Sequence, residues 1–139
     1  MKRLLLPVLV LAGSLAQPAL AQDTLYERLG GKDGVARIVD QSFTLFLADP
    51  RVKDDFDNIS PVHFKMRLAE EFCMISGGPC IYHGEPIKLE HSALGVTQAK
   101  FNAVAEDVQA AMHQIGIPFW TQNQLLALLA PMQRDIVTK

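Results

Sequence analysis

The chain has 139 residues, with 13 Lys and Arg against 15 Asp and Glu, and a formal net charge of −2. A chain of this length forms one domain around a single hydrophobic core. Its weakly acidic balance argues against nucleic acid and against an anionic membrane surface as partners, because both attract basic proteins.

The N-terminal segment has the pattern of a secretory signal peptide. It begins with Lys2 and Arg3, continues with an apolar stretch over residues 4–12, and has small residues at Ala19 and Ala21. A proline and a glycine interrupt the apolar part, which is also short for a membrane span. We therefore predict a cleaved signal peptide over residues 1–21 and not a membrane anchor.

Cleavage would leave one domain over residues 22–139, which we expect in the periplasm and not on a membrane. Two basic residues leave with the signal peptide, so the mature chain has 11 basic and 15 acidic residues, a balance of −4. Export also places Cys73 and Cys80 in an oxidising compartment, where such a closely spaced pair can close a small loop. A disulfide needs Cα atoms about 4.4 to 6.8 Å apart, so two buried free thiols remain the alternative.

From Thr24 onward the sequence predicts helices separated by glycine and proline, without the alternating pattern of a strand. Thr24 is a suitable N-cap for a first short helix, and Ser60 followed by Pro61 is a strong start signal for a later one. Thr97 and Thr121 are the predicted N-caps of the last two helices. The predicted helices cover residues 25–29, 32–48, 61–75, 87–94, 98–115 and 122–136, with a short turn at residues 52–56.

Each long helix has one apolar stripe, as expected for helices that pack around a shared core. In the helix over residues 61–75 the stripe is unusually aromatic, with Phe64 and Phe72 on it. Pro131 should kink the last helix or shift its ends. The sequence therefore predicts a single compact all-α domain.

His91 lies in a short, weak helical segment that a bound ligand would help to order. Phe43 and Phe56 add to the aromatic stripe, so a large flat apolar ligand would find suitable walls. No serine-nucleophile motif surrounds the neighbouring Ser92, and the chain contains neither HExxH nor CxxCH. A single neutral imidazole that faces an apolar slot suits one axial bond to haem iron.

Zinc is the alternative metal for this histidine. A structural zinc takes four ligands of the His, Cys or carboxylate type. His63, His83 and His91 would have to supply them together with the two cysteines, and their spacing matches no familiar zinc motif.

From Thr24 to about Ile136, which is nearly all of the mature chain, the sequence resembles the group 1 truncated haemoglobins. The double glycines and the histidine fall at the intervals of this family without requiring gaps. The matching pieces are LYERLGG at 25–31, FLADPRV at 46–52, Phe56, Gly77-Gly78-Pro79, Tyr82 and Gly84, the block from Pro86 to His91, and GVTQAKFNAVAEDV at 95–108.

This resemblance implies a shortened globin fold, in which two helix pairs form a two-over-two sandwich around one haem b per chain. The haem would be held non-covalently because CxxCH is absent, with His91 as the proximal iron ligand and Phe56 stacked on the ring. Arg67 and Lys88 are candidates to pair with the haem carboxylates, with an ordinary solvated charge as the alternative for each. The predicted cofactor-binding residues are Phe43, Phe56, Phe64, Arg67, Leu68, Phe72, Lys88 and Phe101.

The chain departs from this family where bound oxygen is stabilised. Members usually have a tyrosine in the second helix, often helped by a glutamine on the helix opposite the histidine. Phe43 and Leu68 correspond to these positions, with Phe64 beside them, and none of the three donates a hydrogen bond. Such a charge-assisted bond contributes about 1.5 to 3 kcal/mol, so oxygen should be held loosely, whereas carbon monoxide and nitric oxide should lose less.

Two polar residues lie close to these positions in the sequence. Glu71 stands where the family often has an aromatic residue, and His63 neighbours Phe64. We expect both side chains to be exposed to solvent, with a polar contact inside the haem pocket as the alternative.

The predicted function is reversible binding of a diatomic gas, namely oxygen, nitric oxide or carbon monoxide, for transport, sensing or scavenging. The alternative is an enzyme on the same haem, either a nitric oxide dioxygenase with an electron donor still to be identified or a peroxidase-like protein. The apolar distal side argues against peroxide cleavage, which needs a polar acid–base group beside the iron. A haem-free helical interaction module is the third reading, and the expected assembly is a monomer or a weak dimer.

Overall fold

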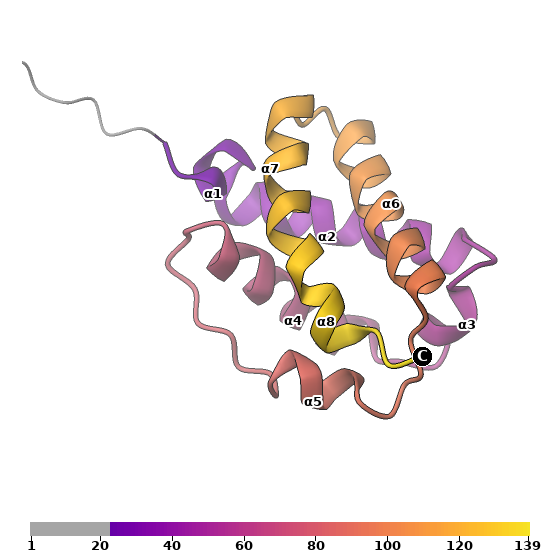
Figure 1. Cartoon of the computed structure of the whole chain (residues 1–139). Helices are drawn as coiled ribbons and strands as arrows, with labels where there is room; N and C mark the ends of the chain where they lie inside the picture. Colours follow the sequence, from indigo (N-terminus) through magenta and orange to yellow (C-terminus); the bar gives the residue numbers. More distant parts are fainter. Residues whose placement is uncertain (1–22) are drawn as a thin grey trace, which may run out of the picture.

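The protein is described by a computed structural model over residues 23–139, and the predicted signal peptide lies outside the described residues. No strand occurs in this part of the chain. The elements in chain order (Figure 1) are α1 (Leu25–Arg28), α2 (Gly31–Ala48), α3 (Lys53–Phe56), α4 (Pro61–Ile75), α5 (Ile87–His91), α6 (Gln98–Gln114), α7 (Phe119–Leu129), the 3-10 helix η1 (Ala130–Met132) and α8 (Gln133–Ile136).

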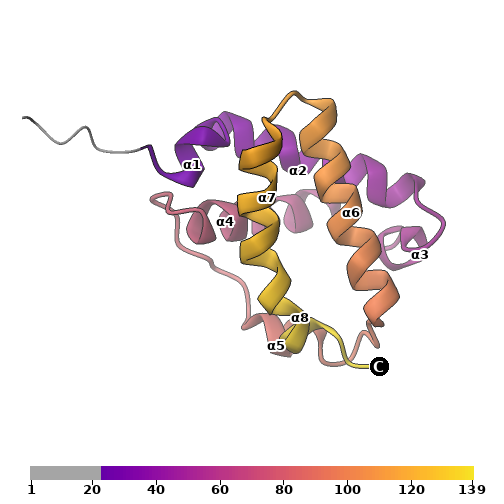
Figure 2. The same cartoon turned by 45° about the horizontal axis from the view of Figure 1, so that its top comes forward.

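The four long helices form two crossed layers. Helices α6 and α7 lie side by side and cross over α2 and α4 (Figure 2). Helix α2 contacts α4 within its own layer and α6 across the two layers, and the short α5 packs against α8 near the chain end. This arrangement confirms the predicted all-α fold and its two-over-two helical sandwich.

Three of the predicted N-caps are present. Thr24 forms a capping box in which its hydroxyl accepts from the backbone N–H of Glu27 and its own N–H donates to the Glu27 carboxylate at 2.7 Å. The hydroxyls of Ser60 and Thr97 accept from backbone N–H groups three residues later. These side chains satisfy N–H groups that have no partner inside the helix, which is why the predicted starts of these helices hold.

The predicted start of α7 at Thr121 is wrong. The helix begins at Phe119, and Thr121 is 3% exposed inside its first turn. Pro118 stands at the N-cap with a backbone angle φ of −58°, and the side-chain amide of Gln122 donates to the carbonyl of Ile117 at 2.8 Å. The fixed φ of proline starts the helix here, so no hydroxyl cap is needed. Pro131 interrupts the helical run as predicted, because α7 gives way to η1 around it.

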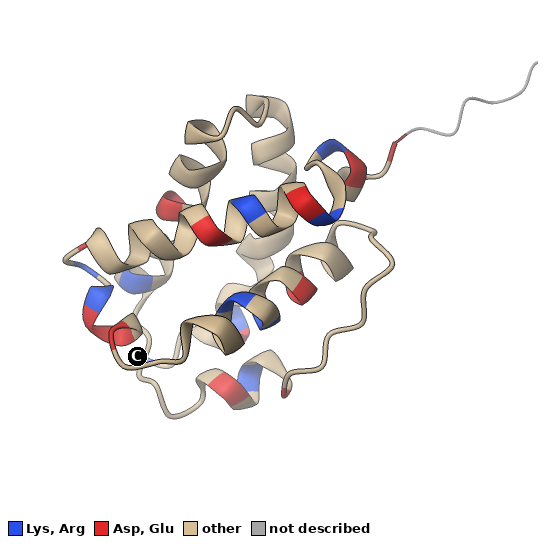
Figure 3. Ribbon diagram, turned by 180° about the vertical axis from the view of Figure 1, so that it is seen from behind, with Lys and Arg blue, Asp and Glu red and all other residues tan. Residues whose placement is uncertain are grey.

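Each of the four long helices contributes a fully buried residue to the centre of the sandwich. These are Phe46, Phe72, Met112 and Leu125, none more than 1% exposed. The outer face of α2 carries charged side chains, whereas α7 has none (Figure 3). No helix among residues 23–139 has both the length and the apolar character needed to span a bilayer.

Candidate functional site

A cavity of about 560 Å³ lies between α4, α5 and α6, with α3 and the segment from Leu129 to Ile136 at its sides. Its size is typical of a small-molecule or cofactor pocket. Most of the lining side chains are apolar. The polar ones are Asp55, Arg67, Glu71, Tyr82, Glu90, His91 and Lys100.

Most of the residues predicted to bind the cofactor lie on the wall of this cavity. Phe43 and Lys88 do not. Phe43 is 5% exposed and packs behind the wall, with its ring centroid 5.6 Å from that of Phe64. It fills the contact between α2 and α4, whereas the ammonium of Lys88 remains in solvent. The predicted residues on the wall are Phe56, Phe64, Arg67, Leu68, Phe72, Phe101 and His91.

His91 is the last residue of α5 and is half-buried on the cavity wall. Its Nδ1 lies 2.7 Å from the carbonyl oxygen of Ile87, one helical turn earlier. A carbonyl only accepts, so Nδ1 carries the proton and Nε2 keeps its lone pair. This is the arrangement of a metal-ligating histidine, in which the bond at one ring nitrogen fixes the tautomer of the other.

The two cysteines form a disulfide, as predicted. Cys73 of α4 is bonded to Cys80 in the following segment, with the Cα atoms 5.8 Å apart. Neither sulfur is therefore a thiolate that binds zinc. Within residues 23–139 no three His, Cys, Asp or Glu side chains cluster closely enough to hold a metal ion, so the zinc alternative has no structural support.

The wall contributed by α3 and α4 is aromatic and apolar. Phe64 packs edge-on against Phe56 with 5.3 Å between ring centroids, and Phe56 stacks on Phe46 at 4.8 Å. Leu68 continues this surface one turn along α4. None of these side chains has a hydrogen-bond donor, so they offer only packing.

Glu71 contradicts the expectation of solvent exposure. It is 6% exposed and lines the cavity, and its Oε2 has no hydrogen-bond partner within the described part of the chain. Burial, reinforced by the charge of Glu90, raises the pKa of this carboxyl. Glu71 follows Leu68 by three positions and therefore shares the stripe that faces the cavity. His63 is exposed, as predicted.

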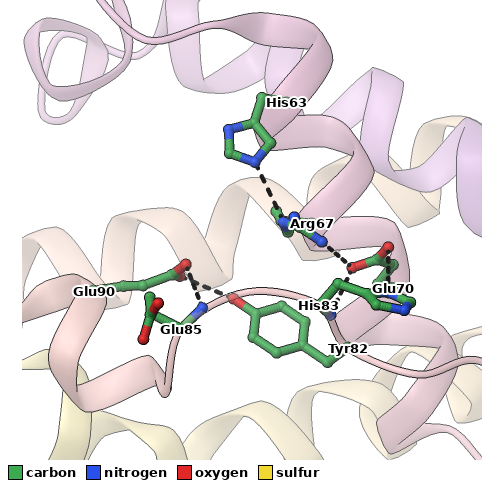
Figure 4. Close-up of polar contacts among 7 residues, drawn as sticks. All are labelled: His63, Arg67, Glu70, Tyr82, His83, Glu85 and Glu90. Atoms are coloured by element: carbon green, nitrogen blue, oxygen red, sulfur yellow. Dashed lines mark hydrogen bonds and ion pairs between the residues drawn. The ribbon is translucent and has the colours of Figure 1, made fainter.

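A polar network lies along one side of the cavity and ties α4 to the segment that follows it (Figure 4). Arg67 donates to Glu70 at 2.8 Å and to His63 at 3.3 Å. Glu70 also accepts from the backbone N–H of His83 at 3.0 Å and lies 3.0 Å from its Nδ1. The N–H of His83, together with Arg67, lowers the pKa of Glu70 to about 2.

A second link in the same view joins this segment to α5 (Figure 4). Tyr82 donates its hydroxyl to Glu90 at 2.9 Å, and the other oxygen of Glu90 accepts from the backbone N–H of Glu85 at 3.2 Å. Burial and the Glu90 carboxylate raise the pKa of Tyr82. Glu90, the residue before His91, is thus bonded to two residues that lie outside α5.

Sequence reasoning did not assign a role in the site to several polar residues that take part in it. Glu70 and Glu90 form the contacts just described, and Lys100 of α6 lines the cavity while its Nζ pairs with Asp55 at 2.7 Å. Only the spacing of Arg67 and Glu70, three residues apart on a helix, is a recognisable ion-pair signal. The contacts of Glu90 span five and eight residues of a segment that is not helical throughout, and Lys100 and Asp55 lie 45 residues apart, so no local pattern marks them.

The residues around the cavity fit a haem. An apolar lining suits the flat macrocycle, and a single imidazole with a free Nε2 suits one axial bond to iron. Arg67 and Lys100 are the cations on the cavity wall that would pair with haem carboxylates.

A profile of the bacterial-like globin family matches residues 24–138. The group 1 truncated hemoglobin GlbN of Mycolicibacterium paratuberculosis is 30% identical over 123 residues, which cover 88% of this chain and 88% of that protein. The group 1 truncated hemoglobin of Tetrahymena pyriformis is 27% identical and covers 84% of this chain and 96% of its own length.

Solved structures give the same answer. The Fe(III) form of truncated hemoglobin from Tetrahymena pyriformis matches with a TM-score of 0.81 at 26% identity, over 84% of this chain and 100% of that one. The 2/2 hemoglobin from Synechococcus, solved with covalently attached heme, has a TM-score of 0.78 at 22% identity and supports the fold alone. The chain therefore belongs to the bacterial-like globin family, as a haem-binding globin of the group 1 truncated haemoglobin type.

Proposed function

We propose that this protein binds a diatomic gas reversibly at the iron of a non-covalently held haem b, with His91 as the protein ligand to the iron. The observation that carries the proposal is the bond from Nδ1 of His91 to the Ile87 carbonyl at 2.7 Å, on a ring that lines the cavity. That bond leaves Nε2 free for a metal. Haem iron held on one face supplies an open position for oxygen, nitric oxide or carbon monoxide.

The side chains of α4 determine how firmly the gas is held. Phe64 and Leu68 line the cavity and exclude water, but neither donates a hydrogen bond. Phe43, which packs behind Phe64, has no donor either. The protein should therefore release oxygen quickly. Its affinity for oxygen relative to carbon monoxide should be lower than that of a globin with a tyrosine in the pocket.

An enzyme on the same haem, either a nitric oxide dioxygenase or a peroxidase-like protein, is the weaker candidate. Peroxide cleavage needs an acid–base group beside the reacting oxygen atoms. Phe64 and Leu68 supply none, which leaves Glu71 as the carboxyl that α4 contributes to the cavity wall. Dioxygenation needs firmly held oxygen and an electron donor. A haem-free interaction module is the third candidate. Such a module would not need His91, whereas both haem functions would.

The test is titration of the purified mature protein with hemin, followed by absorption spectra of the ferric, ferrous and carbon monoxide forms. We expect a Soret shift at one haem per chain in the wild type. His91→Ala should lose the spectrum of an imidazole-bound iron, whereas His83→Ala, which changes an exposed histidine, should keep it. No Soret shift in the wild type, or the same spectrum in His91→Ala, would contradict the proposal.

Oxygen release from the ferrous protein tests the role of α4. Leu68→Gln introduces an amide N–H on the cavity wall contributed by α4, and we expect it to slow oxygen release by about tenfold or more, as one charge-assisted hydrogen bond would. Carbon monoxide release should change less. Slow oxygen release already in the wild type would show that another donor acts in the pocket.

We also propose that the protein acts in the periplasm, because residues 1–21 have the pattern of a signal peptide. We expect it to be a monomer or a weak dimer. The full chain, expressed in a Gram-negative host, should yield a periplasmic protein whose first residue is Gln22. Mass spectrometry of each cell fraction measures this. An unprocessed chain confined to the cytoplasm is the contrary result.

A further inference from the structure

Glu71 is the one carboxyl on the cavity wall that has an oxygen without a partner in the described part of the chain. It is 6% exposed, and its Oε2 is fully buried with no hydrogen bond. Most buried polar groups in proteins are hydrogen-bonded, and an unsatisfied one costs about 1 to 3 kcal/mol. Oε2 is closed to the cavity as well, so we expect the partner of this carboxyl at its other oxygen, supplied by whatever fills the cavity that Glu71 lines.

The neighbouring polar groups are already engaged. Arg67, one turn earlier on α4, donates to Glu70 at 2.8 Å, and Tyr82 from the following segment donates to Glu90 at 2.9 Å. From α5, Glu90 faces Glu71 with a like charge, and the imidazole N–H of His91 is directed to its own helix. No cation or hydroxyl in this group is bonded to Glu71.

These surroundings decide which form of the carboxyl is present. Burial and the charge of Glu90 raise the pKa of Glu71, which favours the protonated acid. A protonated carboxyl has an O–H that donates, so it needs an acceptor. Among the side groups of haem b, only the two carboxylates are strong acceptors, since the others are apolar. Arg67 lies on the same wall and attracts negative charge toward it.

We propose that Glu71 binds a carboxylate on the edge of the haem, with its acid O–H as the donor. This inference rests on the proposed haem function. It makes Glu71 a binding residue for the cofactor in place of the aromatic packing that the family often has there. The competing explanation is that the carboxyl only destabilises an apolar pocket. Replacement of Glu71 by an apolar residue should speed hemin release if the proposal is correct, and should slow it or leave it unchanged if the competing explanation is correct.

The test compares the wild type, Glu71→Leu, Glu71→Gln and the control Glu85→Leu, which removes an exposed carboxylate outside the cavity. Each apoprotein is loaded with hemin or with iron etioporphyrin, which has alkyl groups in place of the carboxylates. The release rate of each macrocycle into excess apomyoglobin is then measured. We expect Glu71→Leu to release hemin about tenfold faster, as for one lost charge-assisted bond, and to release iron etioporphyrin at the wild-type rate.

Glu71→Gln keeps a donor and should stay within about threefold of the wild type for hemin, because an amide N–H is a somewhat weaker donor to a carboxylate than an acid O–H. Glu85→Leu should change neither rate. Slower or unchanged hemin release from Glu71→Leu would overturn the proposal, and so would equally faster release of both macrocycles, which is a packing defect. If the wild type takes up no hemin, the proposed function itself has failed.

Infrared spectroscopy gives a readout that needs no comparison of release rates. At neutral pH the apoprotein should show the C=O band of a protonated carboxyl, and the band should be missing in Glu71→Gln. Hemin should shift this band and iron etioporphyrin should not. A band that hemin leaves in place would overturn the proposal even if Glu71→Leu failed to fold. A band that both macrocycles shift equally would also overturn it, because the partner of Glu71 would then be water or a group at the iron site.

Discussion

The two helices that face each other across the cavity are built very differently. Helix α4 has 15 residues, a serine cap followed by proline, and three buried residues. Helix α5, which carries His91, has five residues, no side-chain cap and no buried residue. A helix of five residues is unstable on its own in water, so contacts outside α5 must hold it in place.

Those contacts are visible around α5. Tyr82 and the N–H of Glu85 both bond to Glu90, the disulfide shortens the segment before α5, and the backbone N–H of Thr138 donates to the carbonyl of Val96 after it. The α4 wall is thus built into the core. The wall that would hold the iron depends on a few polar and covalent links, and it should open at a lower free energy.

The largest expected effect comes from the α4 wall. Phe72→Ala removes a side chain that is 1% exposed, and it should lower the free energy of unfolding by about 3 to 5 kcal/mol. Leu89→Ala on α5, where the side chain is 59% exposed, should change it by less than about 0.5 kcal/mol. Urea unfolding of the apoproteins measures both. Equal losses would refute the contrast between the two walls.

The disulfide should matter next. Replacement of Cys73 and Cys80 by serine frees an eight-residue loop, which costs about 2 to 3 kcal/mol on the chain-entropy estimate. Because this loop leads into α5, amide hydrogen exchange in α5 should accelerate more than in α4. The reduced wild type is the matched control and should behave like the double variant. A uniform acceleration across both helices would mean that the disulfide stabilises only the whole fold.

Tyr82→Phe should have a smaller and more local effect. It removes the hydroxyl that donates to Glu90 at 2.9 Å, and the loss of one such bond costs about 1 kcal/mol. Exchange of the α5 amides should accelerate about fivefold on this basis, while exchange in α4 stays unchanged. Tyr26→Phe removes the hydroxyl of the other tyrosine and is the control. If both variants accelerate α5 equally, the link between Tyr82 and Glu90 does not position the helix.

The same contrast explains what the sequence could predict. The bounds of α4 follow from local signals, namely the cap at Ser60, Pro61 and an apolar stripe, and the structure matches them. The resemblance to the truncated haemoglobins, which spans the domain, identifies His91 as the iron ligand. The structure places His91 on the cavity wall. Apart from the disulfide, the links that hold α5 join residues that meet only in the fold, for example Tyr82 and Glu90, so no local pattern reveals them.

Glu71 shows why one residue on a correctly predicted helix was misplaced. Its position on the stripe points inward, whereas its charge favours solvent, and the sequence does not decide between these two tendencies. The packing of α4 against the cavity decided in favour of burial, at 6% exposure. The start of α7 failed for a related reason, because Pro118 and the side chain of Gln122 replaced the hydroxyl cap predicted at Thr121.

The smallest expected effect is a pH dependence at the link between α4 and the segment before α5. The pKa of Glu70 falls from 4.5 in the unfolded chain to about 2, because the N–H of His83 and the guanidinium of Arg67 favour its carboxylate. A lowered folded-state pKa contributes stability above the unfolded pKa, and this contribution is lost as the pH falls toward the folded value. Glu70→Gln should therefore be less stable than the wild type by a constant amount above pH 4.5, and the difference should shrink between pH 4.5 and about 2.

Urea unfolding of the two apoproteins across this range measures that difference, with Glu85→Gln as the control for removal of an exposed carboxylate. A difference that persists unchanged down to pH 2 would mean that Glu70 acts through its shape and not through its charge. A difference that shrinks as expected, together with faster exchange in α5, would identify an electrostatic link from α4 to the wall that carries His91. Because that link runs through the segment between the helices, loosening it should leave exchange in α4 unaffected.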